Sequence, residues 1–129
     1  MILGLDISTT CTGVAVLNTK GEEVLCTYIK LSSKDTIMKR ARQVENFLQK
    51  IKDEYNIKAV YVEQSLHMFQ SGRSSAKVLS MLTKFNGIVS WICFDMFGVE
   101  PEFIPATSAR KEVGIKIQRG QKAKTIVLN

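Results

Sequence analysis

The spacing of the apolar residues changes once along the chain, and this change limits the folds that the chain can adopt. Before residue 32 the apolar residues form short continuous runs, whereas over Ile37–Tyr55 they recur every three or four positions. Short runs bounded by turn residues predict buried strands, and a spacing of three and four predicts an amphipathic helix. The chain therefore begins with strands and continues with alternating helices and strands.

The order of these elements is typical of an α/β domain. The first strands follow one another through short loops, because Asn18–Gly21 has the composition of a hairpin turn. Gly98 and Pro101 end the second long helix, whose expected buried stripe begins at Val78 and ends at Met96. This order predicts a five-stranded mixed sheet flanked by helices. The expected strands are Ile2–Asp6, Thr12–Leu17, Val24–Leu31, Ala59–Glu63 and Glu102–Pro105, and the expected helices are Ile37–Tyr55, Val78–Met96 and Thr107–Val113.

Length and composition predict a single domain that spans residues 1–129. The 129 residues are 45% hydrophobic and 23% charged, which excludes a disordered chain and a collagen-like repeat. Three widely spaced cysteines and one histidine favour neither a zinc site nor a disulfide framework. The most apolar stretch, Phe85–Val99, is short and contains Asp95, so we expect a buried helix and no membrane span. We therefore expect a cytoplasmic protein.

Basic residues accumulate near the end of the sequence. The formal net charge is +6, and residues 105–129 contribute +5 of it through six basic residues and one acid, Glu112. Such a segment is compatible with nucleic-acid binding and equally typical of a solvated face. The six basic residues are Arg110, Lys111, Lys116, Arg119, Lys122 and Lys124.

Two acids stand at the ends of expected strands. Asp6 closes the first strand and Glu63 closes the fourth. Acids at the carboxyl ends of neighbouring parallel strands point into the crevice where α/β sheets bind ligands. A carboxylate buried there needs a metal, a basic partner or a raised pKa. The alternative is that both acids only hydrogen-bond to loops at the strand ends.

The first hairpin carries the most specific motif. Residues 2–16 read Ile-Leu-Gly-Leu-Asp-Ile-Ser-Thr-Thr-Cys-Thr-Gly-Val-Ala-Val. This segment resembles the opening hairpin of the RNase H-like superfamily and, more narrowly, of the RuvC-type Holliday junction resolvases. Their second acid is followed by Gln, as Glu63 is followed by Gln64, and their later basic segment is matched here by Gly114 and Lys122.

The resemblance implies a metal-dependent endonuclease that resolves Holliday junctions or other branched DNA. Carboxylates in such enzymes hold two Mg²⁺ or Mn²⁺ ions roughly 3.5–4 Å apart. It implies that Asp6 bridges the ions and that Glu63 ligates one of them, as catalytic and metal-binding residues. Hard oxygen ligands suit Mg²⁺.

The sequence departs from the RuvC pattern in its last acids. The family carries further active-site acids on a final helix, but no acid follows Glu112, which is a weak substitute. We therefore expect a domain that lacks the final catalytic helix, is incomplete at its C-terminus, and is inactive or weakly active as it stands.

The segment after Glu63 contains candidate DNA contacts. RuvC-like proteins place an aromatic wedge three residues past the second acid, where this chain has Leu66, with Phe69 three residues later. Apolar wedges can unstack bases, although Phe69 is equally compatible with packing under the loop. Arg73, Lys77 and Lys84 follow at helical spacing and form either a DNA-binding strip or an ordinary solvent face.

The second long helix and the first hairpin leave further possibilities open. Apolar residues surround most of that helix near Trp91 and Phe94, which predicts a partner, and a homodimer fits the two-fold symmetry of a four-way junction. The segment after Asp6 also resembles the first phosphate loop of sugar kinases and actin-like ATPases, which need two lobes of this fold. A non-catalytic DNA-binding module with the same fold is a further alternative.

Overall fold

The computed structural model describes residues 1–64 and 76–105. Strands and helices follow one another there in the expected order, and the strand ends differ from the expected ones by at most one residue. The elements are β1 (Ile2–Asp6), β2 (Cys11–Leu17), β3 (Glu23–Lys30), α1 (Ile37–Glu54), β4 (Ala59–Gln64), α2 (Ala76–Phe97) and β5 (Glu102–Pro105).

The strands form one mixed sheet with β1 at its centre. The order across the sheet is β3-β2-β1-β4-β5. β1 pairs antiparallel with β2 and parallel with β4, while β3 and β5 occupy the two edges. The expected mixed sheet is therefore confirmed, and β1 and β4, the strands that carry the two acids, are neighbours.

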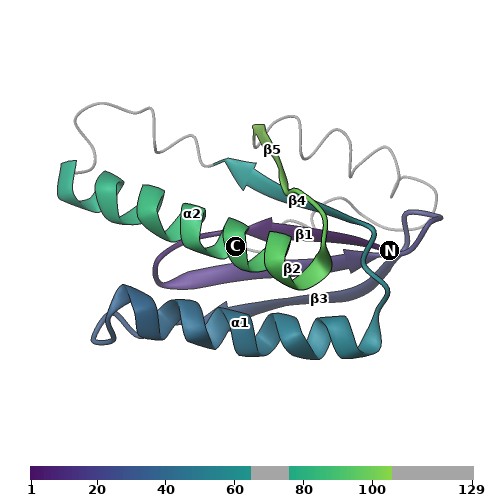
Figure 1. The fold of residues 1–129 in the computed structure, drawn as a ribbon, viewed down its shortest axis with the longest axis horizontal. Coiled ribbons are helices and arrows are strands. Elements are labelled where there is room, and N and C mark those ends of the chain that lie inside the picture. The colour runs from purple at the N-terminus through teal and green to yellow at the C-terminus, as the bar shows by residue number, and fades with distance from the viewer. Residues whose placement is uncertain (65–75, 106–129) are drawn as a thin grey trace.

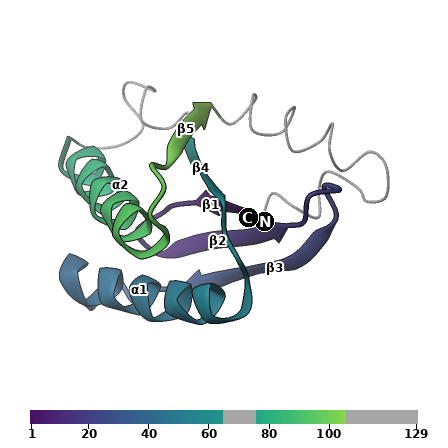
Figure 2. The same cartoon turned by 45° about the vertical axis from the view of Figure 1, so that its right-hand side comes forward.

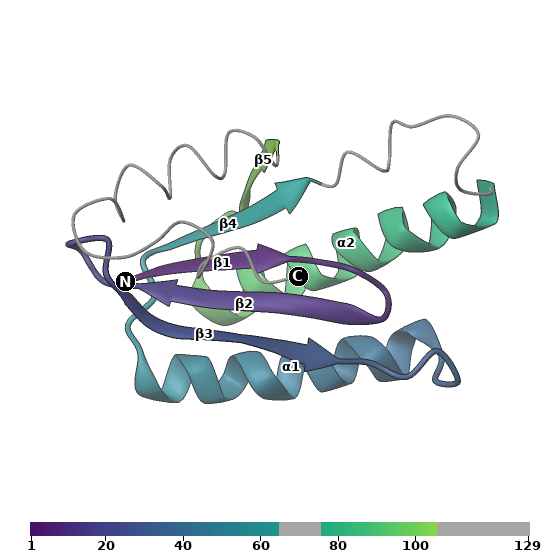
Figure 3. The same cartoon turned by 180° about the vertical axis from the view of Figure 1, so that it is seen from behind.

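Both helices cover the same face of the sheet. They lie in front of the strands in Figure 1 and behind them in Figure 3, and they remain on one side in the turned view of Figure 2. Strand residues alternate between the two faces, so every second residue of β1, β2 and β4 points toward the helices. The core between the layers includes Leu3, Leu5, Val14, Val16, Val60 and Val62 from the sheet and Val44, Leu48, Phe85 and Val89 from the helices.

Helix α1 begins at a capped end. The Thr36 hydroxyl accepts a hydrogen bond from the Lys39 backbone N–H at 3.2 Å, which satisfies one of the amides that a helix leaves unpaired at its start. The expected apolar stripe of α1 is buried against the sheet, from Ala41 to Ile51. Arg40 is buried with them.

Helix α2 differs from its expected buried stripe at the first position. Phe85, Val89 and Ile92 are buried as predicted, but the prediction for Val78 was wrong, because its side chain is 53% exposed. The first turns of α2 extend past the ends of the strands, so no sheet lies under them (Figures 1 and 3). Neither α1 nor α2 combines the length and the apolar character that a membrane crossing requires. The expected helix Thr107–Val113 lies outside the described residues.

Candidate active site at the ends of β1 and β4

Asp6 and Glu63 are directly paired across the sheet. Asp6 is the last residue of β1, and the parallel ladder sets it opposite Glu63 near the end of β4. Neighbouring strands lie about 4.8 Å apart, and residues paired in register point to the same face. The two carboxylates therefore project side by side from adjacent strand ends.

The alternation of side chains along each strand determines the face of the sheet on which the two acids lie. Leu5 and Ile7 on either side of Asp6 belong to the core beneath the helices, and so does Val62 before Glu63. Asp6 and Glu63 consequently face away from α1 and α2, and both are half-buried. Farther along the same face lies a small apolar cluster of Ile2, Ala15 and Leu17. The carboxylates thus lie on the same face as this cluster, at the other end of β1.

The neighbours of the pair on the same face are small or apolar. On one side Asp6 is paired with Gly13 of β2, which contributes no side chain, and on the other side Glu63 is paired with Ile104 of β5. The position of Gly13 therefore leaves the flank of the Asp6 carboxylate without a side chain from β2.

The turn between β1 and β2 directly follows Asp6 and is held by hydrogen bonds. The Thr10 backbone N–H donates to the Ser8 hydroxyl at 3.3 Å, and the Leu31 N–H donates to the Thr10 carbonyl at 2.9 Å. The first bond is a local Ser/Thr turn, and the second fixes the turn to the end of β3. The backbone that leaves the site is thereby tied to the sheet.

A third hydrogen bond to this turn comes from Arg40, a residue that was not predicted to belong to the site. Its Nη1 donates to the Thr9 carbonyl at 3.0 Å, although 31 residues separate the two. A signal was available in the sequence: position 40 lies three residues after Ile37 and four before Val44, within the buried stripe. A charged residue at such a position indicates a buried polar contact.

The two carboxylates are donors of the kind that a hard divalent cation takes. Carboxylate oxygens are the ligands that Mg²⁺ and Mn²⁺ prefer, and Mg²⁺ commonly keeps several waters with only one or two carboxylates. Within residues 1–64 and 76–105, no group of three acids, histidines or cysteines comes together in a way that would hold a metal. The donor set of Asp6 and Glu63 therefore fits one partly hydrated ion.

The thiols of Cys26 and Cys93 are poor nucleophiles at neutral pH. Burial raises the pKa of Cys93 to about 12. Burial also raises the pKa of Cys26 to about 11, with a further contribution from the charge and the hydrogen bond of Glu23. Both thiols therefore stay protonated, and a protonated thiol is a poor nucleophile.

The predicted DNA contacts are only partly within the described residues. Lys77 and Lys84 lie on α2 and are exposed, seven residues apart and hence on the same side of the helix. The wedge candidates Leu66 and Phe69 and the predicted contact Arg73 lie outside the described residues, as do Arg110, Lys111, Lys116, Arg119, Lys122 and Lys124. No side-chain position is therefore assigned to them.

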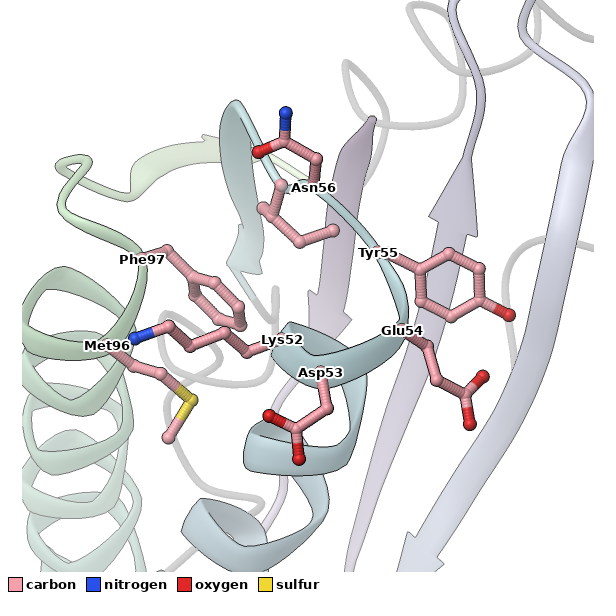
Figure 4. A pocket seen from close by; sticks show the side chains of 8 residues that line it. Lys52, Asp53, Glu54, Tyr55, Asn56, Met96 and Phe97 are labelled. Carbon is pink, nitrogen blue, oxygen red and sulfur yellow. The ribbon is translucent and has the colours of Figure 1, made fainter.

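Two concave surfaces lie away from the acids. The α1–α2 groove, of about 660 Å³, is lined by Ile37, Met38, Lys84, Gly87, Ile88 and Trp91. Around it the side chains of Met38 and Trp91 are 68% and 61% exposed. A second pocket, of about 390 Å³, lies between the C-terminal ends of the helices, where Lys52 and Asp53 approach Met96 and Phe97 (Figure 4).

Comparison with known proteins gives similarity in structure alone. No protein-family model matches the chain, and no curated protein matches its sequence. The structure of T. thermophilus RuvC in complex with a Holliday junction substrate superposes with a TM-score of 0.70 at 16% identity, covering 96% of this chain and 86% of that one. A second Thermus thermophilus RuvC structure superposes with a TM-score of 0.62 at 18% identity, covering 96% and 87%.

The similarity extends over most of both chains. At 16–18% identity it establishes the arrangement of strands and helices and leaves the chemistry open. The five-stranded mixed sheet with flanking helices matches that arrangement. This chain therefore has the RNase H-like fold of RuvC.

Proposed function

We propose that this protein is a metal-dependent, structure-selective endonuclease that cleaves Holliday junctions or other branched DNA. The observation that carries the proposal is the direct pairing of Asp6 with Glu63 at the carboxyl ends of two parallel strands. The shared fold with a RuvC structure in complex with a Holliday junction substrate supports branched DNA as the substrate class.

Asp6 and Glu63 supply carboxylate oxygens as ligands, and the strands that carry them hold these oxygens in place. We assign to them the binding of Mg²⁺ or Mn²⁺, with Asp6 shared between two ions in a complete site. A bound divalent ion supplies Lewis-acid catalysis, which activates a water and stabilises the leaving oxygen of the phosphodiester. Two carboxylates are fewer ligands than a pair of ions requires, so we expect efficient cleavage only where further acids complete the site.

The DNA contacts are assigned to basic side chains of α2 and of the segments that follow β4 and β5. Lys77 and Lys84 lie on the half of α2 that follows residues 65–75, the segment after β4. Contacts from lysine to phosphate position DNA without reading its sequence, and they release counterions. Arg73 and the basic residues of segment 105–129 are the other candidates, and Leu66 and Phe69 remain the candidate wedges.

A binding experiment tests the substrate class. We expect the protein to bind a four-way junction more tightly than linear duplex DNA of the same length in Ca²⁺ or EDTA. The substitution Lys77→Gln should weaken junction binding and reduce the slope of log Kd against log salt by about 1. Lys84 is left unchanged in this test because it lines the α1–α2 groove. Lys20→Gln is the matched control, because Lys20 is exposed in the turn between β2 and β3. Equal binding to junction and duplex, or an unchanged slope, contradicts the assignment.

We further propose that a second copy of the chain covers the α1–α2 groove. The groove and its exposed Trp91 and Met38 form an apolar surface of the kind that marks interaction sites. No atom lies within 4 Å of the place that a Cβ would take at Gly87, so this part of the groove is open to a partner. A homodimer matches the two-fold symmetry of a four-way junction, which needs two symmetric cuts.

The dimer has a direct test. In sedimentation experiments at tens of micromolar we expect a dimer for the wild type and a monomer for Trp91→Glu, because a charge in the apolar groove is left without a partner. Phe103→Glu, on an exposed residue of β5, serves as the control and should remain dimeric. A wild-type protein that is monomeric at high concentration contradicts the dimer proposal.

Two other function classes predict different results. A lobe of a sugar kinase or actin-like ATPase binds ATP saturably and has no affinity for branched DNA. A non-catalytic DNA-binding module binds junctions without a divalent metal and after Asp6→Asn, as the nuclease does, but it cleaves them under no condition. Calorimetric titration with ATP, together with a cleavage assay in Mg²⁺ and Mn²⁺, separates these classes from the nuclease.

A further inference from the structure

Arg40 is the one arginine in the described residues whose guanidinium is buried and fully engaged with loops. Its side chain is 6% exposed. Nε donates to the Asp35 carbonyl at 3.0 Å, Nη1 to the Thr9 carbonyl at 3.0 Å, and Nη2 to the Ser33 carbonyl at 2.8 Å. Each of its three nitrogens thus binds a backbone oxygen.

The three acceptors belong to two loops that meet at one end of the sheet. Ser33 and Asp35 lie in the connection from β3 to α1, and Thr9 lies in the turn from β1 to β2. A guanidinium is a rigid planar fork, so it fixes the spacing of the carbonyls that it binds. Arg40 therefore ties the start of α1 to the turn that follows Asp6.

This contact lies next to the proposed metal ligand along the backbone. Thr9 is three residues after Asp6, and Ile7 between them is anchored in the core. The Leu31 N–H holds the next carbonyl, that of Thr10, at 2.9 Å. The turn is therefore held by Ile7, by Leu31 and by Arg40. Without Arg40, the Thr9 carbonyl loses its donor, and the backbone that carries the Asp6 carboxylate gains freedom.

We propose that Arg40 is a positioning residue for the site: by clamping the β1–β2 turn from behind the sheet, it holds Asp6 in the geometry that binds a divalent cation. This inference rests on the proposed function, because it assigns a cation to Asp6. Groups that orient a metal ligand without touching the metal commonly change metal affinity by 10–100-fold when they are removed. Arg40 orients Asp6 in this way through the backbone of the β1–β2 turn.

The test measures binding of Mn²⁺ alone, by electron paramagnetic resonance of the free ion. We expect Arg40→Met, which keeps the length of the side chain and removes its donors, to weaken Mn²⁺ binding about tenfold. Arg40→Lys should also weaken it, because one ammonium cannot span three carbonyls in two loops. Val44→Ala is the control: it lies one turn farther along the same stripe of α1, and truncating its fully buried side chain destabilises the core without removing a hydrogen bond to the turn. It should bind Mn²⁺ as the wild type does.

A second readout follows the turn itself. In Arg40→Met, the amides of Thr10 and Leu31 should exchange with solvent at least tenfold faster than in the wild type, while amides in the middle of β1 keep their protection. If the methionine variant does not fold, the same measurement is made on Arg40→Lys. Val44→Ala should not show this local change.

The outcomes separate this inference from the proposed function. Arg40 variants that bind Mn²⁺ as tightly as the wild type, or a Val44→Ala variant that weakens binding equally, overturn the positioning role. If Asp6→Asn removes Mn²⁺ binding and Arg40→Met weakens it while junctions are never cleaved, the positioning role stands and the proposed nuclease fails. If Asp6→Asn leaves Mn²⁺ binding unchanged, both fail.

Discussion

Asp6→Asn is expected to abolish junction cleavage while junction binding is retained. The amide has the shape of the carboxylate but lacks its negative charge, so it loses the attraction for a divalent cation. Loss of a metal ligand at a phosphoryl-transfer site removes several kcal/mol of transition-state stabilisation, and about 4 kcal/mol corresponds to a rate lower by about a thousandfold. Binding of DNA depends on lysine contacts to phosphate and should change less than about threefold.

The measurement is single-turnover cleavage of a four-way junction in Mg²⁺ or Mn²⁺ by a longer version of the protein in which further acids complete the site, with binding measured separately in Ca²⁺. Glu63→Gln should behave as Asp6→Asn does, because the two residues share one register position. Asp53→Asn, an exposed acid near the end of α1, is the matched control and should cleave normally. Cleavage within tenfold of the wild-type rate by either active-site variant would falsify the metal-site assignment.

The largest effect on stability is expected at Phe85. Its side chain is fully buried on α2, in the core that this helix shares with the sheet and α1. Truncating a buried phenylalanine to alanine removes its transfer free energy and leaves a cavity, at a cost of about 3–5 kcal/mol. Since small domains unfold with about 5–15 kcal/mol, Phe85→Ala should lose a large part of the total stability.

Urea unfolding followed by circular dichroism measures this loss. Phe103→Ala is the control, because the same side chain on β5 is 44% exposed, and it should cost about 1 kcal/mol. Nearly equal free energies of unfolding for the two variants would mean that α2 does not pack on the sheet as described.

Much of the fold could be predicted from the sequence because the signals are local. The bounds predicted for Ile2–Asp6 and Glu102–Pro105 agree with those of β1 and β5, because each segment is a short run with its own local signal: an apolar run that ends in an acid for the first, and the residues after Gly98 and Pro101 for the second. The apolar stripe of α1 is buried as its spacing of three and four residues requires. The same reasoning predicts a buried side chain for Val78, and this prediction was wrong. Periodicity identifies the apolar face of a helix but does not tell where the sheet beneath that face ends.

The site was partly predictable. The sequence places Asp6 and Glu63 at strand ends, and the prediction that β1 and β4 are neighbours is confirmed. Arg40 was missed, because one charged residue among several on α1 looks solvated unless its place in the buried stripe is noticed. The contacts of the DNA-binding candidates from Leu66 to Arg73 and beyond Pro105 stay predictions.

The sequence by itself determined which segments are strands and helices, because backbone propensity, side-chain periodicity and turn residues act over a few neighbouring positions. Only the tertiary structure decided that Asp6 lies opposite Glu63 and that Arg40 reaches Thr9. Both depend on strand order and register between segments that are far apart in the chain. A shift of one residue in that register would turn one of the two acids to the other face of the sheet.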